Sequence, residues 1–172
     1  MTSCDVFKLR TRENPTSSSG WILPDSAQIV IKNLRNSFID LNIVNYSNNF
    51  DDSFAYYPDS ITYSRNPDLF NNWDKTREIQ NATVMFSQIR SNPDVNISIL
   101  SVDTVGDTVN FLCPYEIQLI LQNGDAVLVR GKSLFEVYPH EDGLYYLLKW
   151  EDFLPDSNVT GSITWSELKA RF

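Results

Sequence analysis

The sequence predicts an α+β domain, with helices in its N-terminal half and antiparallel strands in its C-terminal half. Residues 25–41 and 74–90 carry apolar side chains at the spacing of three and four that is typical of amphipathic helices. From Val95 onward, apolar and polar residues alternate with a period of two, as in half-buried strands. The chain has 172 residues, of which 42% are hydrophobic, which suits one domain with one core.

The charge balance argues against several classes of partner and cofactor. Lys and Arg number 14 and Asp and Glu 22, for a net charge of −8, so the chain repels phosphate backbones and we expect no nucleic acid. The single histidine, His140, and the lack of CxxC or HxxxH spacing predict no metal site. We expect no cofactor, because the sequence has no phosphate loop, dinucleotide fingerprint or nucleophile elbow.

The first 23 residues are predicted to be a flexible tether, because residues 11–20 are polar and turn-prone without a helical or strand period. A single domain is expected over residues 24–172, with a C-terminal extension from about residue 154. Asp25 followed by Gln28 has the form of a capping box and predicts the start of the first helix. The apolar stripe of this helix would comprise Ala27, Val30, Ile31, Leu34, Phe38 and Leu41.

Shorter elements are expected between the two long helices. Residues 44–50 suit one helical turn, and residues 54–57 a short strand ended by Pro58. Residues 59–72 read as a long irregular loop, a length typical of lids and binding loops. Asp74 is the expected cap of the second helix, whose buried stripe would be Ile79, Ala82, Thr83, Phe86 and Ile89.

The remaining elements form a meander. We favour a hairpin around Asn123-Gly124 in which Leu119 lies opposite Val129 and Glu116 opposite Lys132. This register leaves one apolar face and one face with an opposite-charge pair. The meander continues through residues 144–150, and a short terminal helix begins after its cap, Thr164.

The order of these elements over residues 24–153 resembles the nuclear transport factor 2-like superfamily, an α+β cone of the cystatin-like type. The residues that carry the resemblance are Ile29–Leu34 with Asn45-Tyr46, then Trp73-Asp74, then Asp142–Asp152. The resemblance implies a curved antiparallel sheet of four or more strands wrapped around N-terminal helices, often with a pocket at its wide end. It implies no single function, because this fold carries both enzymes and non-enzymatic modules.

Cys4 is a candidate lipid attachment site. Ser3-Cys4-Asp5, the polar tether and a closing segment over residues 164–169 resemble uncharacterised bacterial envelope lipoproteins of this superfamily. A lipidated Cys4 would bind a membrane and place the domain in the bacterial cell envelope, if a signal peptide was removed. The alternative is an incidental thiol in a disordered terminus. A disulfide between Cys4 and Cys113 is disfavoured because the chain is not cysteine-dense.

An enzymatic reading is also open. The resemblance implies a small-molecule lyase or isomerase of the ketosteroid isomerase or scytalone dehydratase type, which needs a base in an apolar pocket and a donor for the oxyanion. The favoured register puts no ionisable residue on the inner face of the central hairpin. The base or donor would come from the carboxylates Asp51, Asp52 and Asp103 or the tyrosines Tyr56, Tyr57 and Tyr63. The pair Asp51-Asp52 is more typical of a solvated turn, and His140 of turn decoration. A buried Asp with a raised pKa would favour the enzymatic reading.

Aromatic residues could line a pocket for a small apolar ligand, although most of them are expected to be core. The candidate pocket residues are Tyr56, Trp73, Ser133, Phe135 and Tyr146. We therefore expect a non-enzymatic envelope lipoprotein that acts as a binding or assembly module. Homodimerisation through the outer sheet face, where Ile120, Leu128 and Leu134 lie among charged residues, is a further expectation.

Overall fold

The computed structural model describes residues 20–156 and 160–172. Cys4 and residues 1–19 of the expected tether lie outside the described residues. In chain order, the elements are α1 (Ala27–Ile39), α2 (Ile43–Ser47), β1 (Phe50–Tyr57), α3 (Ser60–Arg65), α4 (Pro67–Phe70), α5 (Lys75–Gln88), β2 (Asp94–Ile97), β3 (Ser101–Val105), β4 (Thr108–Ile120), β5 (Ala126–Pro139), β6 (Tyr145–Phe153), β7 (Ser162–Ile163) and α6 (Trp165–Lys169).

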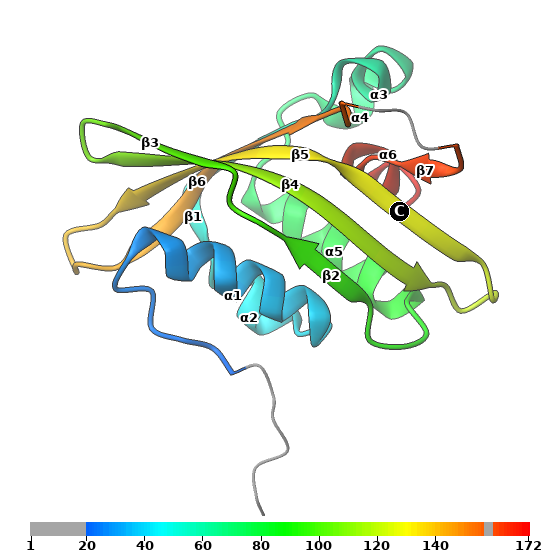
Figure 1. Ribbon diagram of the computed structural model, residues 1–172, viewed down its shortest axis with the longest axis horizontal. Helices are drawn as coiled ribbons and strands as arrows, with labels where there is room; N and C mark the ends of the chain where they lie inside the picture. The colour runs from blue at the N-terminus through cyan, green and yellow to red at the C-terminus, as the bar shows by residue number, and fades with distance from the viewer. Residues whose placement is uncertain (1–19, 157–159) are drawn as a thin grey trace, which may run out of the picture.

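The described strands form one seven-stranded sheet with the order β1-β6-β5-β4-β2, in which β3 also pairs with β4 and β7 with β5. The sheet is mixed, because β1 runs parallel to β6 and β7 parallel to β5, whereas the remaining pairs are antiparallel. Figure 1 shows β4 and β5 crossing in front of α5, with α1 and α2 below the strands in this view. The expected α+β class and the sheet wrapped around the N-terminal helices are therefore confirmed.

The register of the central hairpin differs from the favoured one by two residues. Leu119 lies opposite Val127, and Glu116 lies opposite Arg130, to which it is bonded at 2.8 Å. The turn is tighter than expected, since the Leu121 amide donates to the Asp125 carbonyl at 2.9 Å. A shift by an even number of residues keeps every side chain on its face, so the apolar pattern could not reveal the error.

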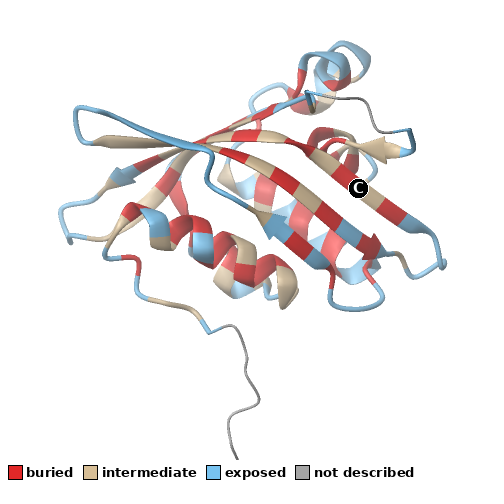
Figure 2. Cartoon of the chain, in the orientation of Figure 1, coloured by how far each residue is buried: buried red, intermediate tan, exposed pale blue. Residues whose placement is uncertain are grey.

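Burial alternates along β4 and β5, with the inner residues covered by the helices (Figure 2). The inner face of this hairpin is apolar as expected. Leu112, Glu116 and Leu134 are half-buried on the outer face, where no described element covers them. No helix among the described residues is long and apolar enough to span a bilayer.

Two helix starts differ in detail from the expectation. The N-cap of α1 is Ser26 rather than Asp25, and no side chain bonds to its first-turn amides, so the predicted capping box is wrong. Asn33 of α1 is a polar residue on the buried side, where its side chain bonds to the backbone N and O of Ile22 at 3.1 and 2.6 Å. At α5 the predicted cap is confirmed, since Asp74 accepts from the Arg77 amide at 2.9 Å.

Residues 59–72 form the two short helices α3 and α4 instead of an irregular loop. The Asp59 carboxylate begins α3 by accepting from the amides of Ile61 and Thr62 at 3.0 and 2.9 Å. Phe70 at the end of α4 is buried and stacks on Trp73 with ring centroids 5.1 Å apart. The segment is thus held by capping and stacking, which a search for helical periodicity over so few residues does not detect.

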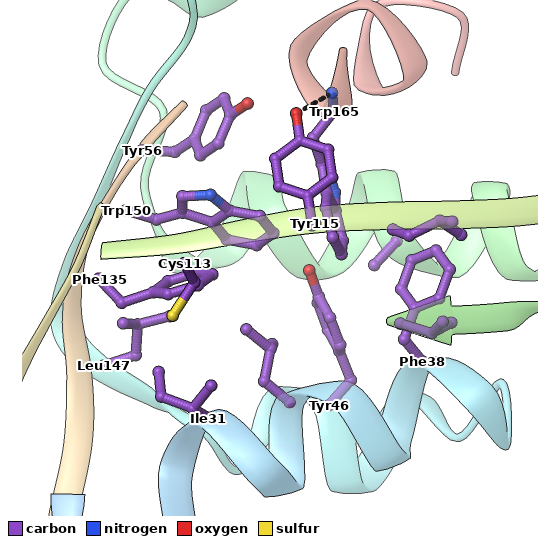
Figure 3. Close-up of a cluster of buried hydrophobic side chains, with 14 of the residues drawn as sticks. Ile31, Phe38, Tyr46, Tyr56, Cys113, Tyr115, Phe135, Leu147, Trp150 and Trp165 are labelled. Carbon is purple, nitrogen blue, oxygen red and sulfur yellow. Dashed lines mark hydrogen bonds between the residues drawn. The ribbon is translucent and has the colours of Figure 1, made fainter. Parts of the chain in front are cut away.

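The C-terminal helix α6 completes the core. Thr164 is its N-cap, as expected, and forms a full capping box with Glu167. The Trp165 side chain is fully buried, and its ring lies 5.1 Å from Phe38, 5.4 Å from Tyr115 and 4.6 Å from Trp150. Figure 3 shows these rings meeting between the sheet and the helices. The space that the curved sheet encloses is therefore filled by the end of the chain itself.

Candidate functional site

A fully buried ion pair joins α5 and α6. Lys169 Nζ contacts Glu78 Oε1, and both side chains are fully buried. Glu78 also accepts hydrogen bonds from Tyr46 Oη at 2.6 Å and Trp73 Nε1 at 2.7 Å. Each Glu78 oxygen therefore already has at least one donor from the chain.

Aromatic rings surround the Lys169 ammonium. Its nitrogen lies 4.4 Å from the ring centroid of Trp150, 4.5 Å from that of Tyr56 and 5.6 Å from that of Trp73. Burial lowers the pKa of Lys169, and the Glu78 charge opposes this shift. Burial also raises the pKa of Tyr46, with the same Glu78 charge adding to the effect. The rings and one carboxylate thus replace the hydration of a buried cation.

A second polar network surrounds Asp152 of β6. Its Oδ1 accepts from Tyr115 Oη at 2.8 Å, and its Oδ2 accepts from the Ser166 amide at 2.8 Å and the Ser166 hydroxyl at 2.5 Å. Tyr115 Oη in turn accepts from the Trp165 amide at 2.9 Å (Figure 3). The network therefore ties β4 and β6 to the first turn of α6.

A buried Asp with a raised pKa would favour the enzymatic hypothesis, and Asp152 is such a residue. Loss of hydration raises its pKa to about 6, although the hydrogen bonds from Ser166 and Tyr115 act in the opposite direction. A carboxyl group with this pKa is suited to proton transfer near neutral pH. In this structure, however, both of its oxygens are bonded to α6 or to Tyr115.

The raised pKa predicts a dependence of stability on pH. The unfolded carboxyl ionises near the ordinary pKa of 3.8 and the folded one near 6. The contribution of Asp152 to stability is therefore greatest below the unfolded pKa and is lost as pH rises through 6. Between pH 4 and pH 8, we expect the free energy of unfolding of the wild type to fall by about 2 kcal/mol more than that of Asp152→Asn, because the asparagine cannot ionise. Urea unfolding of both proteins at each pH measures this; a wild-type-minus-variant difference that does not change with pH contradicts it.

An open groove lies beside these networks, bordered by β1, α3, α4 and the end of β6. Its volume is about 890 Å³. Aromatic side chains dominate its lining, with three carboxylates among them. The lining residues are Phe54, Ala55, Tyr56, Tyr57, Pro58, Asp59, Ser60, Tyr63, Phe70, Asn71, Asn72, Trp73, Asp74, Asp152, Phe153 and Leu154.

The structure brings only part of the predicted pocket together. Tyr56 and Trp73 line the groove. Ser133 and Phe135 lie in the core, where Ser133 accepts from Trp150 Nε1 at 2.9 Å and Phe135 packs on the Trp150 ring. Tyr146 lies elsewhere, with its ring 4.6 Å from that of His140. The groove therefore lies along β1 and the end of β6, and no residue of β5 lines it.

His140 and Asp51 form a pair that the sequence interpretation did not foresee. His140 Nε2 contacts Asp51 Oδ2, and Asp51 is buried at the start of β1 rather than in a solvated turn. Asp52 is ion-paired with Lys75 at 2.7 Å. The expected role of Asp51 as a solvated turn residue is wrong, whereas His140 does lie in the β5–β6 turn, from which it reaches Asp51. Neither residue lines the groove.

Sequence reasoning missed Glu78, Asp152 and Lys169. Glu78 shares the buried face of α5 with Ala82 and Met85, and Asp152 follows Trp150 on the inner face of β6, so both positions obey the spacing of core residues. The signal that could have identified Glu78 and Asp152 as buried acids was a charged residue at a position with the spacing of core residues. Thr83, which was placed on the buried stripe of α5, is exposed.

The described part of the chain contains no group of three potential metal ligands among its His, Cys, Asp and Glu residues. Cys113 is a free thiol buried in β4, and burial raises its pKa to about 12. Such a thiol is protonated at neutral pH and is a poor nucleophile.

No protein-family model matches this sequence, and no curated protein matches it. Solved structures do. A nuclear transport factor 2-like superfamily protein from Salmonella enterica aligns with a TM-score of 0.61 and 9% identity, over 77% of this chain and 90% of that one. A ketosteroid isomerase-like protein from Erwinia carotovora atroseptica gives 0.57 and 11%, over 73% and 91%. A hexachlorocyclohexane dehydrochlorinase gives 0.58 and 12%, over 73% and 80%. At these identities the similarity shows the fold alone.

Proposed function

From the nuclear transport factor 2-like fold of this chain, we propose that it is a non-enzymatic module that binds a small, largely apolar molecule in the groove between β1, α3, α4 and β6. One observation carries the proposal. Helix α6 fills the space inside the curved sheet, and the groove beside it stays open. Ligand sites of this size are typically lined by aromatic side chains with a few polar groups.

The bonding of the buried acids supports a binding role over catalysis. A general base needs a lone pair within reach of the proton that it removes. Glu78 accepts from Tyr46, Trp73 and Lys169, and Asp152 accepts from Tyr115 and Ser166. Removing either acid from these bonds would release α6 from the core, so these acids serve the fold.

The second candidate function is a lyase or isomerase with Asp152 as the base and Tyr115 as the oxyanion donor. The observation that favours it is the pKa of Asp152, about 6, in a side chain that lines the groove. The hydroxyls of Tyr115 and Ser166 would have to leave the carboxylate before a substrate could reach it. This requirement makes it the weaker candidate.

Cys4 carries the second part of the proposal, which is anchoring to a bacterial cell envelope. Small residues precede it, and a polar stretch of residues separates it from the domain. Two acyl chains and an amino-terminal acyl group on one cysteine provide stable membrane attachment, whereas one chain does not. The polar stretch would let the groove face away from the bilayer.

The outer face of β4 and β5 is the proposed surface for a homodimer. Ile120 is exposed there, and Leu128 and Leu134 are half-buried. Ion pairs between neighbouring strands, such as Glu116 with Arg130, neutralise the charges on this face. An apolar surface of this kind suits a second copy of the same chain.

Mass spectrometry of the protein from its native host tests the proposed ligand binding and the proposed lipid anchor. We expect an acyl-sized increment on Cys4 that survives denaturation, and a small molecule that is present under gentle conditions and lost on denaturation. Incubation of the recovered molecule with the protein should return it unchanged, whereas its conversion would favour the enzymatic candidate. An unmodified Cys4 contradicts the anchor, and a chain without any bound molecule contradicts the binding role.

A further inference from the structure

The inference here rests on the proposed binding function and names the chemical class of the ligand. We infer that the groove binds an organic cation, an amine or quaternary ammonium group carried on an apolar body. Three observations support this inference. They are the charge of the lining side chains, the aromatic rings among them, and the cations of the chain that already contact those rings.

The charged residues that line the groove are all acidic. They are Asp59, Asp74 and Asp152, and no Lys, Arg or His belongs to the described lining. Asp59 and Asp152 are buried and bonded within the chain, whereas Asp74 is exposed and uses one oxygen to cap α5. A negative potential in a cleft attracts cations and disfavours anions. Asp74 is the carboxylate that a ligand could reach.

The lining also contains exposed aromatic rings. Tyr57 and Tyr63 are 50% and 48% exposed, and they line the groove together with the buried stacked pair of Phe70 and Trp73. The face of an aromatic ring attracts an ammonium group by about 0.5–1 kcal/mol at exposed sites and more where the site is dry. Several rings and one accessible carboxylate form the usual surroundings of a bound quaternary ammonium.

Cations of the chain itself already contact several of these rings. The buried Lys169 ammonium lies against Tyr56 and Trp73, and the Arg77 guanidinium lies 5.1 Å from the Trp73 centroid. Lys149 lies 5.3 Å from the Tyr57 centroid, with its charge balanced by Glu136 and Glu151. The same rings thus already stabilise positive charge, including one charge that has no contact with water.

Three probes with one apolar body and different charges test the ligand class. Phenylbutylamine is a cation at neutral pH, phenylbutanol is neutral and phenylbutyrate is an anion. Titration of the full-length protein by calorimetry should give a dissociation constant for the amine at least about fivefold lower than for the alcohol, and the carboxylate should bind more weakly than either. Binding of the alcohol as tightly as the amine would overturn the cation inference and leave the apolar groove intact.

Variants separate a specific site from the general negative charge of the chain. Asp74→Asn keeps a good helix cap but removes the charge, so it should weaken amine binding severalfold and leave alcohol binding unchanged. Asp107→Asn makes the same change in the β3–β4 turn, away from the groove, and should alter neither. Equal losses in both variants would mean that only net charge attracts the amine. Failure of all three probes to bind would overturn the proposed binding function together with the inference.

Discussion

Replacing Lys169 by methionine is expected to lower the free energy of unfolding by about 3–5 kcal/mol. Methionine fills a similar volume but leaves the Glu78 carboxylate buried without its cation, and Tyr46 and Trp73 alone do not neutralise it. The three rings that face the ammonium would lose their electrostatic contact as well. Urea unfolding monitored by tryptophan fluorescence measures the loss.

The double variant Lys169→Met with Glu78→Gln is the matched control. It removes both charges at once, so no ion is left buried without a partner, and we expect it to regain at least half of the lost stability. A single variant as stable as wild type would show that the pair is not buried as described. Equal losses in the single and double variants would show that packing, rather than the unpaired charge, causes the effect.

Trp165→Ala is expected to destabilise the domain by about 3–5 kcal/mol, the range for removal of a large core side chain. Its ring fills the space between Phe38 of α1, Tyr115 of β4 and Trp150 of β6. No neighbouring side chain can close the cavity without leaving its own place in the core. Thermal or urea unfolding measures the change.

Trp21→Ala is the control for this variant, because it removes the same side chain from a half-buried position before α1. We expect a loss of about 1 kcal/mol or less there. A Trp165 variant within about 1 kcal/mol of wild type would contradict the conclusion that α6 fills the core. In that case the interior of the sheet would be accessible, and the enzymatic candidate would gain support.

These variants connect the stability of the chain to its proposed function. In this structure α6 occupies the interior, and its bonds to Asp152 and Glu78 use the acids that a catalyst would need. Two of the rings that line the groove, those of Tyr56 and Trp73, also face Lys169. With α6 in this position, the interior is filled and the groove beside it stays open.

The pattern of apolar residues determined the class of the fold. The helical spacing in α1 and α5, the cap at Asp74 and the alternation along β4 and β5 each depend on residues close in the sequence. The two helices, the cap and the faces of the two strands are confirmed, although Thr83 of the predicted α5 stripe is exposed. Tyr56 and Trp73, which the sequence offered as aromatic pocket residues, both line the groove.

Tertiary structure alone decided the features that depend on distant residues. The pairing of Lys169 with Glu78 joins positions 91 residues apart, and that of His140 with Asp51 joins positions 89 apart. The register of the β4–β5 hairpin can shift by two residues while every side chain stays on the same face of the sheet. The Lys169 charge is buried because the assembled fold supplies its partner and the surrounding rings. The pattern of residues near Lys169 in the sequence does not identify that partner. The sequence by itself thus determined the elements and their faces, and the packed chain decided that its own C-terminal helix fills the interior and leaves the groove as the candidate site.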